Sequence, residues 1–448
     1  MNKIKFPLVV VGSQWGDEGK GKVVDILAKE ADYVVRFNGG NNAGHTIVLN
    51  GEKFPLSLLP SGVLQGKKLF ISQGVVIDPA VLLREIDFFL KRKMKVDLMI
   101  DPRVHVVMPY HKMLDAATEL WKGKKATGSL KLGIGYCYED KNNRFGIRVE
   151  DLIDPDSLAE KVKMYLPLKK LQITKVFGQP ADLYETQIVK EYARYGTLLK
   201  KYVGDVSETI QNALNSHAEL VSASDFRNRS RNKFGMTKGS KKILFEGAHG
   251  TFLDAVFGTY PYTTAVYTIS GSVFPYVGIA PQRIYSMGIV KAYTTRVGNG
   301  PFPTELLNST GDEIRKNGNE FGTVSKRPRR CGWLDLVLVR TAARLSGFDY
   351  LTLTKLDVLS KLKKIKVCTH YILYNKKIRE LPAGMKDFAK CKPVYVELRG
   401  WNRDISASKE LKNLPQEARK YIKFIEKELQ IPFRFVFVGP EREQTIKI

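Results

Sequence analysis

Apolar and polar residues follow two recurring patterns along the chain. Residues 7–12 (PLVVVG) form a β-branched run that predicts a buried parallel strand, and residues 19–31 place apolar side chains at a period near 3.6, which predicts an amphipathic helix. Further strands are expected at residues 33–37, 69–72, 95–100, 243–246, 350–354, 364–373 and 433–438. Further helices are expected at residues 79–91, 111–122, 181–216, 335–346 and 415–429. Strands that alternate with helices favour an α/β fold with a mostly parallel sheet and helices on both faces.

Length and cysteine content narrow the class of protein. The 448 residues correspond to one large α/β body or to two or three linked units, at roughly 100–200 residues per domain. The four cysteines form no CxxC pair and no zinc-like spacing, which excludes a disulfide scaffold and a structural zinc site and favours a cytoplasmic protein. No apolar run reaches the roughly 20 residues that span a bilayer, and residues 1–7 lack the apolar core of a signal peptide.

The net charge of +26 comes from 72 Lys and Arg against 46 Asp and Glu. Such a charge is compatible with nucleic acid, an anionic membrane surface or highly anionic small substrates, and equally with lysines that only coat the surface. Basic residues are spread over the whole chain, so charge alone does not choose among these partners. Residues 216–242 are rich in Ser, Asn, Arg, Lys and Gly, which predicts a solvated, flexible loop; a contact of its arginines with an anion or RNA is the weaker alternative.

The first motif with chemical meaning is GDEGKGK at residues 16–22, between the first strand and the first helix. Its glycines let backbone N–H groups approach phosphate oxygens, and the helix N-terminus adds a positive dipole. The spacing satisfies G-x-x-x-x-G-K, but Val23 stands where a P-loop needs Ser or Thr for Mg²⁺. Asp17 offers a replacement oxygen ligand. A tight strand-to-helix turn without a ligand is the alternative.

The second motif is NGGNNAGHT at residues 38–46, which follows a predicted strand. Small residues and amides suit a loop that wraps a polar ligand. A lone histidine is more often structural than catalytic, but His45 lies within this glycine-rich loop. We therefore favour proton transfer as its role.

Two further motifs lie in the second half of the chain. GTVSKRPRRCGW at residues 322–333 combines arginines with Ser and Thr hydroxyls, which indicates an anion clamp. Upstream, residues 295–305 (TRVGNGPFPTE) form a rigid turn that could be purely structural. TKLD at residues 354–357 ends a predicted strand. Its carboxylate can accept from guanine N1 and N2 together, so beside a phosphate loop this tetrapeptide indicates a guanine nucleotide.

Together these stretches resemble the adenylosuccinate synthetase family, the GTP-dependent ligases of purine nucleotide synthesis. The blocks that carry the resemblance are QWGDEGKGK (14–22), NNAGHT (41–46), GTYP (258–261), TRVGNGPFPTE (295–305), RPRRCGW (327–333), TKLDVL (354–359) and the closing GP (439–440). The likeness runs nearly end to end and is interrupted at residues 216–242, which resemble an insertion. It implies a single large α/β domain over residues 1–448, with a long, mostly parallel sheet, a P-loop-like phosphate loop after the first strand, and a homodimer.

The resemblance also implies a mechanism. Asp17 is implied as the general base that takes the N1 proton of IMP, so that O6 attacks the γ-phosphate of GTP, and as a ligand of Mg²⁺ beside the carbonyl of Gly44. His45 is implied to donate a proton to the β,γ-bridging oxygen as GDP leaves. The amino group of L-aspartate then displaces phosphate from the 6-phosphoryl intermediate and gives adenylosuccinate. Mg²⁺ and arginines neutralise the charge that develops in transfer.

Three sets of binding residues follow from the same resemblance. GTP contacts are expected at Gly16, Asp17, Glu18, Gly19, Lys20, Gly21, Lys22, Gly44, His45, Thr46, Arg329, Lys355, Leu356, Asp357 and Gly439. IMP contacts are expected at Asp17, Lys20, Asn42, Ala43, Gly44, His45, Ser129, Arg144, His249, Thr264 and Arg327. Aspartate contacts are expected at Thr323, Val324, Ser325, Lys326 and Arg327. Arg144 would reach IMP across the dimer interface, and neither a membrane nor nucleic acid is expected as a partner.

Several positions depart from the family pattern. The departures are Ser129-Leu130 for a Thr-Thr phosphate contact, His249 for a glutamine, Ala265-Val266-Tyr267 for Ser-Ser-Asn, Val324 for a threonine, Lys326 for a glycine and Phe437 for a serine. Most of them fall where IMP should bind, whereas the Mg²⁺, γ-phosphate and guanine positions mostly persist. The sequence therefore predicts a retained phosphoryl-transfer machinery and an altered acceptor pocket.

A divergent adenylosuccinate synthetase is the leading interpretation. The first alternative is a paralogue that joins aspartate, or another amino acid, to a different purine monophosphate. The second is a catalytically weak GTP-binding or RNA-binding protein that keeps the scaffold. The charge of +26 favours this last alternative slightly, but the retention of both Asp17 and His45 counts against it.

Overall fold

A central sheet of nine strands organises the computed structural model, which describes residues 3–222, 241–322 and 328–448. Its strands lie in the order β19-β18-β14-β10-β1-β9-β2-β5-β7. Every neighbouring pair is parallel except β18 and β19. The bounds are β1 (Leu8–Gly12), β2 (Tyr33–Arg36), β5 (Lys68–Ile71), β7 (Asp97–Ile100), β9 (Ile243–Gly250), β10 (Tyr285–Lys291), β14 (Tyr350–Thr354), β18 (Phe433–Phe437) and β19 (Thr445–Lys447).

Both faces of this sheet are buried. Side chains alternate between the faces of a strand, and in β1 Leu8 and Val10 belong to one hydrophobic cluster while Val9 and Val11 belong to another. The Leu8 cluster includes apolar residues of α1 (Lys20–Ala28), α2 (Pro79–Lys91), α3 (Pro109–Lys122), α6 (Pro155–Leu171) and α7 (Glu185–Leu199). The Val9 cluster includes those of α8 (Val206–Ser222), α9 (Val273–Val277), α10 (Ser309–Asn317), α11 (Leu336–Ser346) and α13 (Gln416–Leu429). Helices therefore cover both faces.

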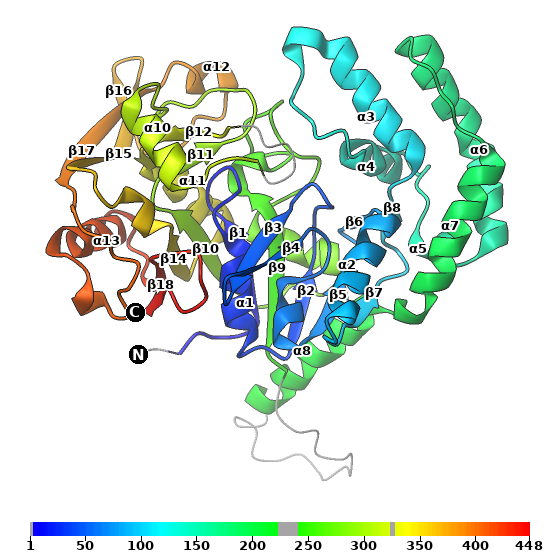
Figure 1. Ribbon diagram of the computed structural model, residues 1–448, viewed down its shortest axis with the longest axis horizontal. Coiled ribbons are helices and arrows are strands. Elements are labelled where there is room, and N and C mark those ends of the chain that lie inside the picture. Colours follow the sequence, from blue (N-terminus) through cyan, green and yellow to red (C-terminus); the bar gives the residue numbers. More distant parts are fainter. Residues whose placement is uncertain (1–2, 223–240, 323–327) are drawn as a thin grey trace.

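Smaller sheets surround the central one. β15 (Lys364–Leu373) pairs with β13 (Leu334–Asp335), β16 (Lys376–Ile378) and β17 (Lys392–Arg399). The two-stranded sheets are β3 (His45–Leu49) with β4 (Glu52–Leu56), β6 (Val76–Ile77) with β8 (His105–Val106), and β11 (Thr294–Arg296) with β12 (Arg330–Gly332). Short helices are α4 (Ile134–Asn143), α5 (Val149–Leu152) and α12 (Met385–Phe388). Figure 1 shows α3, α6 and α7 at one side of the molecule and the β15–β17 sheet at the other.

Most predicted elements are confirmed, including the strand at residues 364–373, but the single helix over residues 181–216 and the start of the loop over residues 216–242 are wrong in part. The pattern over residues 181–216 is two helices, α7 and α8, because the chain turns at Gly204 and the Asp205 carboxylate caps α8 by accepting from the amide of Glu208 (2.8 Å). The strand at residues 364–373 is β15, which lies outside the central sheet. Helices α4 and α6 were not predicted. In the segment 216–242, residues 216–222 continue α8, and residues 223–240 lie outside the described residues.

Candidate active site

The candidate site lies along one edge of the central sheet. Carboxyl ends of parallel strands meet at the same edge, and the predicted site segments follow directly after β1, β2 and β14. These strands lie in the middle of the sheet, where β9 separates β1 from β2 and β10 separates β1 from β14. The N-terminus of α1 opens at the same edge, and a helix N-terminus favours bound anions.

Glu18 shapes the phosphate loop. Its carboxylate is fully buried: one oxygen accepts from the amides of Gln14 (3.0 Å) and Gly16 (2.9 Å), and the other lies 2.7 Å from the Lys20 ammonium. A Cβ at Gly12 would lie 2.3 Å from this carboxylate, so the strand must end in glycine. The Glu18 side chain thus faces its own loop, and only its backbone is left to contact a nucleotide.

Asp17 occupies a left-handed turn between two glycines. Gly16, Asp17 and Gly19 have φ of 87°, 58° and 85°, a conformation that suits anion-binding backbone concavities. The Asp17 side chain is 31% exposed, and its Oδ2 lies 2.8 Å from Nε of Arg329, without the alignment of a hydrogen bond. The structure therefore brings together Asp17 and Arg329, which the sequence predicted for the same site.

His45 packs directly on the first turn of α1. A Cβ at Gly21 would lie 2.5 Å from Cδ2 of the His45 ring, so the close approach requires glycine. The His45 Nε2 lies 2.8 Å from the Ser61 hydroxyl, which in turn donates to Oε1 of Glu246 (2.7 Å). Sequence analysis missed Ser61 and Glu246; the signal for Glu246 is a carboxylate on a strand that is otherwise apolar.

The electrostatic surroundings of His45 favour its neutral form. Burial is the largest effect and lowers the pKa of His45. The Glu246 carboxylate opposes burial, while Arg36 and Lys20 act in the same direction as burial. In the substrate-free protein the imidazole is therefore neutral near pH 7.

The predicted guanine segment follows β14. Lys355 adopts a left-handed conformation (φ 57°), and its ammonium donates to the carbonyl of Gly318 (2.9 Å) and to Glu320 (2.6 Å). Oδ1 of Asp357 is buried and has no hydrogen-bond partner among the described residues, and burial raises the pKa of this carboxyl group. Leu356 is part of the core, so only its backbone can contact a ligand.

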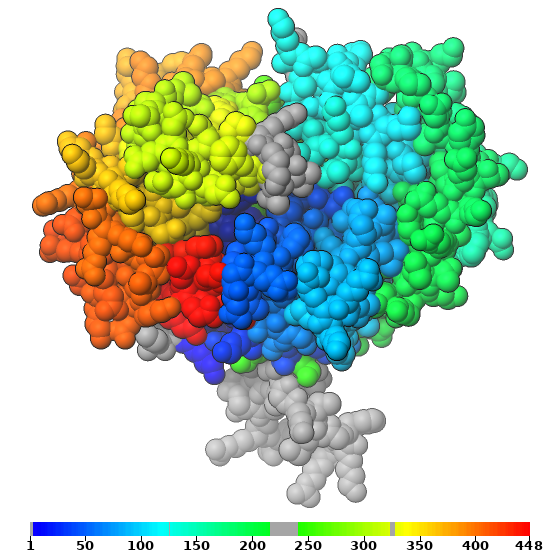
Figure 2. Space-filling view, in the orientation of Figure 1, coloured from blue at the N-terminus to red at the C-terminus, as the bar shows by residue number. Residues whose placement is uncertain are grey.

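Lys22 connects α1 to the closing segment of the chain. Its ammonium donates to the carbonyl of Gly439 (2.8 Å) and lies 4.2 Å from the centre of the Phe437 ring. Burial lowers the pKa of Lys22 to about 7. Figure 2 shows the C-terminal residues (red) beside the β3–β4 hairpin (blue), where Val48 and Glu441 form a β-bridge. Lys22 and Gly439 are thus brought together, and the ammonium holds the closing segment.

The predicted acceptor region contains polar atoms without partners. Both ring nitrogens of His249 and the side-chain oxygens of Asn41 and Asn42 are buried and have no hydrogen-bond partner among the described residues. A Cβ at Gly39 would lie 3.3 Å from the His249 ring, so this ring lies against the NGGNN loop. Burial, reinforced by two nearby cations, lowers the pKa of His249 to about 3, and the ring is neutral.

The other predicted acceptor residues have individual surroundings. The Ser129 hydroxyl donates to Asp115 (2.8 Å), and the Thr264 amide donates to the carbonyl of Leu253 (2.8 Å). Arg144 is the exposed C-cap of α4. The Ala43 amide closes a turn, Gly44 precedes β3, and Thr46 is exposed on β3. The predicted aspartate residues, Thr323, Val324, Ser325, Lys326 and Arg327, lie outside the described residues.

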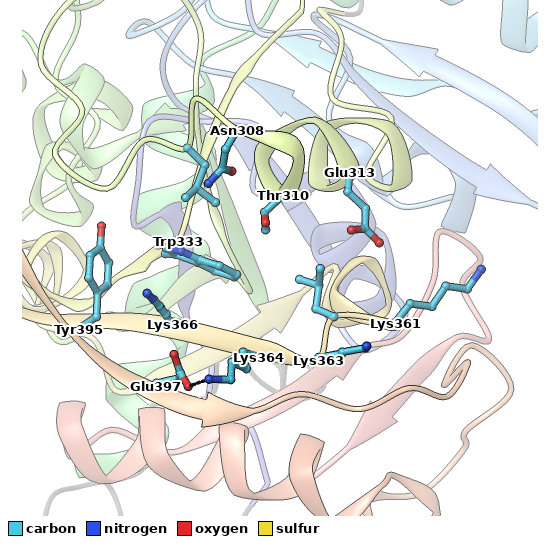
Figure 3. Close-up of a pocket in the computed structure, with 12 residues that line it drawn as sticks. Asn308, Thr310, Glu313, Trp333, Lys361, Lys363, Lys364, Lys366, Tyr395 and Glu397 are labelled. Atoms are coloured by element: carbon cyan, nitrogen blue, oxygen red, sulfur yellow. Dashed lines mark ion pairs between the residues drawn. The ribbon is translucent and has the colours of Figure 1, made fainter.

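A cavity of about 640 Å³ lies between α10 and the β15–β17 sheet (Figure 3). Its lining is Leu306, Asn308, Thr310, Glu313, Trp333, Lys361, Leu362, Lys363, Lys364, Lys366, Tyr395 and Glu397. Lys364 of β15 and Glu397 of the neighbouring strand β17 form an ion pair (2.7 Å) on the sheet side of the cavity. No residue predicted to bind substrate lines this cavity, so we place the reaction at the sheet edge.

No group of three or more His, Cys, Asp or Glu residues within residues 3–222, 241–322 and 328–448 could hold a metal ion by itself. In the same ranges no helix has the length and apolar character to cross a bilayer.

Comparisons with known proteins agree with the geometry. The family model described as adenylosuccinate synthetase matches residues 9–223 and 232–446. The curated adenylosuccinate synthetase of Acetivibrio thermocellus is 48% identical over 443 residues, covering 98% of this chain and 99% of the relative. The enzyme of Carboxydothermus hydrogenoformans is 45% identical over 442 residues, covering 98% of each.

Solved structures give the same result. The fully ligated adenylosuccinate synthetase of Plasmodium falciparum matches with a TM-score of 0.87 and 35% identity, covering 98% of this chain and 99% of that chain. A cyanophage S-2L succinoaminodeoxyadenylate synthetase, bound to dGMP and dATP, matches with a TM-score of 0.59 and 20% identity over 99% and 96% of the chains, which shows a shared fold alone. The chain belongs to the adenylosuccinate synthetase family, the GTP-dependent ligases of purine nucleotide biosynthesis.

Proposed function

We propose that this chain joins L-aspartate to IMP in two steps, using GTP and giving adenylosuccinate, GDP and phosphate. The observation that carries the proposal is the meeting of a carboxylate and an imidazole at one helix N-terminus: Asp17 lies in the turn before α1, and His45 packs on Gly21 within its first turn. We place the reaction in the cytoplasm, an assignment supported by four cysteines that are all free thiols.

In the first step Asp17 takes the N1 proton of IMP, and O6 attacks the γ-phosphorus of GTP. The bond between the γ-phosphorus and the β,γ-bridging oxygen breaks, and GDP leaves with a proton from His45. The negative charge of a bound triphosphate would raise the pKa of the buried His45, so nucleotide binding itself prepares the acid. The hydroxyl of Ser61, held by Glu246, keeps the imidazole in one orientation.

In the second step the amino group of L-aspartate attacks C6 of the purine and displaces phosphate, which carries away the original O6. Phosphorylation makes this oxygen a good leaving group. Residues 323–327 would bind the aspartate, with Arg327 between the two substrates. Arg329 follows this segment in the chain and lies beside Asp17. From there it would contact GTP.

The residues present fit Mg²⁺. This ion is usually held by one or two carboxylates together with substrate phosphates and water, and the partly exposed Asp17 carboxylate beside an anion-binding helix terminus provides such a donor. We propose that Asp17 and the carbonyl oxygen of Gly44 hold Mg²⁺. When bound, the ion neutralises charge on the transferring phosphoryl group.

Guanine recognition is assigned to the segment after β14. The unpaired Asp357 oxygen is an acceptor for guanine N1–H and N2–H. Lys355 and Gly439 would border the base, and Lys22 would keep the closing segment in place. Adenine has no donor at N1, so the same carboxylate would reject ATP.

The residues of the proposed acceptor pocket are compatible with IMP and also with a second candidate substrate. The neutral His249 ring offers one donor and one acceptor on different sides of the ring, so one of its nitrogens can contact the N1–H and O6 edge of a 6-oxopurine. His249 stands where the family pattern has a glutamine, and Leu130 replaces a hydroxyl contact to phosphate. These departures favour, as the alternative, a purine monophosphate other than IMP.

We further propose a homodimer in which Arg144 reaches the IMP phosphate of the partner subunit. Arg144 is exposed at the end of α4, and the next residue, Phe145, packs on Tyr165 of α6 (5.3 Å between ring centres). Phe145 (37%) is itself partly exposed, and Met164 (63%), the neighbour of Tyr165 on α6, is exposed as well. An exposed apolar surface beside a functional arginine is typical of a subunit interface.

The chain is proposed to act as one domain with one insertion. The family model omits residues 224–231, within the segment that interrupts the resemblance. We assign no catalytic role to this insertion.

Phosphate release from GTP tests the proposed reaction. Purified protein with GTP, Mg²⁺ and L-aspartate would be assayed with IMP, GMP, XMP and their deoxy forms. We expect release with IMP, dependent on aspartate, and adenylosuccinate as the product. Release with another acceptor in place of IMP would establish the alternative, and no release with any acceptor would contradict the proposed function.

A further inference from the structure

Glu320 is a fully buried carboxylate to which the proposed mechanism gives no role. Its Oε1 accepts from the ammonium groups of Lys355 (2.6 Å) and Lys291 (3.1 Å) and from the hydroxyl of Tyr293. Its Oε2 accepts from the guanidinium of Arg329 (2.8 Å). These three cations hold the pKa of Glu320 well below its usual range in spite of burial, which acts in the opposite direction. The side chain is therefore an anion that binds four donors.

Two of these donors belong to opposite ends of the proposed GTP site. Lys355 begins the segment that carries Asp357, the proposed guanine acceptor. Arg329 lies with Nε 2.8 Å from Asp17, the proposed base for phosphoryl transfer. Glu320 is thus a single carboxylate that binds both Lys355, next to the proposed guanine acceptor, and Arg329, next to the proposed position of the transferred phosphate.

The other two donors fix Glu320 in place. Lys291 ends β10 and also donates to the Thr295 hydroxyl (2.6 Å), and its burial lowers its pKa to about 8. Tyr293 follows on the same segment and is fully buried. The backbone is fixed as well, because the amide of Arg329 donates to the carbonyl of Glu320 (2.9 Å). Lys291 and Tyr293 therefore anchor Oε1 of Glu320, which they share with Lys355, and Arg329 binds Oε2.

We propose that Glu320 is a positioning residue that couples guanine recognition to phosphoryl transfer. This inference rests on the proposed function. Hydrogen bonds that share one buried carboxylate influence one another, so the position of Lys355 beside the guanine ring affects the position of Arg329. When Asp17 receives substrate, Arg329 keeps its bond to Glu320 and stays oriented toward the phosphate end of the site.

A double-mutant cycle measures this coupling directly. Arg329→Lys and Lys355→Gln would be made singly and together, and kcat/KM for GTP measured at saturating IMP and aspartate. Residues in one network usually show non-additive effects. With Glu320 present, we expect the loss of kcat/KM in the double variant to differ by at least about fivefold from the product of the two single losses. With Glu320→Gln in all proteins of the cycle, this difference should be less than about twofold.

Single variants separate positioning from folding. Glu320→Gln should lower kcat/KM for GTP by at least about tenfold and leave KM for IMP within about threefold, and Glu320→Asp, which keeps the charge, should recover part of the loss. Asp335→Asn is the matched control, because Asp335 is also buried, accepts from a tyrosine hydroxyl (Tyr371) and caps α11. It should lower the melting temperature without changing KM for GTP.

The outcomes are distinguishable. An unchanged cycle in the Glu320→Gln background, or equal effects of Glu320→Gln and Asp335→Asn on kcat/KM for GTP, would overturn the inference while leaving the reaction itself in place. If Glu320→Gln is not soluble, the same cycle in the Glu320→Asp background decides, with weakened coupling expected and full coupling contradicting the role. Failure of the wild type to release phosphate would instead contradict the proposed function.

Discussion

The candidate site has two ends: the donor end, where we propose that GTP binds, and the acceptor end, where we propose that IMP binds. Their polar groups are arranged in different ways. At the phosphate side of the donor end charged groups are paired with one another: Asp17 with Arg329, Arg329 with Glu320, and Glu320 with Lys355. At its guanine side Oδ1 of Asp357 has no partner among the described residues. At the acceptor end buried polar atoms lack partners among the described residues, notably both ring nitrogens of His249 and Oδ1 of Asn42. Buried polar groups normally find partners, so we expect the unpaired atoms to contact substrate and the paired charges to position the groups around the transferred phosphate.

The contrast explains where the sequence departs from the family pattern. A network of paired charges tolerates little change, because removal of one partner leaves a buried charge uncompensated. Polar groups that meet only the substrate can change together with that substrate. The departures at Leu130 and His249 belong to the acceptor end that we propose, as this reasoning expects, whereas Phe437 departs beside Lys22 at the donor end.

The largest predicted effect would break the donor end. Asp17→Asn keeps the size of the side chain but removes the base and the charge that Mg²⁺ and Arg329 use. Turnover should fall by about 10²–10⁴-fold, while GTP binding measured by calorimetry largely survives. Asp312→Asn, a change at an exposed carboxylate, serves as the control. Turnover of Asp17→Asn within about threefold of wild type would contradict the assignment of Asp17.

The second prediction concerns recognition of the guanine ring at the donor end. Sites built around hydrogen bonds reject mismatched ligands by about 10⁴-fold, so wild type should strongly prefer GTP over ATP. Asp357→Asn should shift preference toward xanthosine triphosphate, because an amide can donate to the 2-oxo group. The measurement is kcat/KM for GTP, ATP and XTP in both proteins. Equal use of ATP and GTP by wild type would show that Asp357 does not read the base.

At the acceptor end a change should improve binding. In a neutral imidazole the donor and acceptor lie on different sides of the ring, whereas the glutamine amide presents both side by side to a 6-oxopurine. His249→Gln should therefore lower KM for IMP by about threefold to tenfold, an effect of about one hydrogen bond. KM for GTP should not change. An altered KM for GTP with an unaltered KM for IMP would show that His249 belongs to the GTP end of the site, which contradicts our assignment.

The last effect concerns stability in acid. The pKa of His249 is about 3 in the folded protein, below the value near 6.5 of an exposed histidine. Below pH 6.5 the unfolded chain therefore binds a proton that the folded chain does not, and stability falls by up to about 1.4 kcal/mol per pH unit. Melting temperatures of wild type and His249→Gln should have the same slope above pH 7, and the variant a shallower loss between pH 6.5 and 4.5. Equal slopes throughout would contradict a buried neutral ring.

Sequence reasoning succeeded where the signal is local. The period of residues 79–91 and the β-branched run of residues 7–12 predicted α2 and β1, and the glycine spacing predicted the loop before α1. It failed where partners are distant in the chain. The Ser61–Glu246 bond and the Lys22–Gly439 bond join residues 185 and 417 positions apart.

Glu320 shows the same limit. Its position just before the aspartate segment carries no mark of its role, because that role depends on cations supplied by β10 and by the residue after β14. No local pattern relates Lys291 to Lys355. The contrast between the paired phosphate side of the donor end and the unpaired acceptor end is therefore a result of tertiary structure alone.

One measurement tests the central claim, that O6 of IMP is phosphorylated before aspartate displaces it. IMP labelled with ¹⁸O at position 6 would be incubated with the protein, GTP, Mg²⁺ and L-aspartate, and the released phosphate analysed by mass spectrometry. Because O6 leaves the purine as part of the phosphate, the mechanism requires the label to appear there in proportion to adenylosuccinate formed. Adenylosuccinate formed together with unlabelled phosphate would contradict the 6-phosphoryl intermediate and the roles assigned to Asp17 and His45.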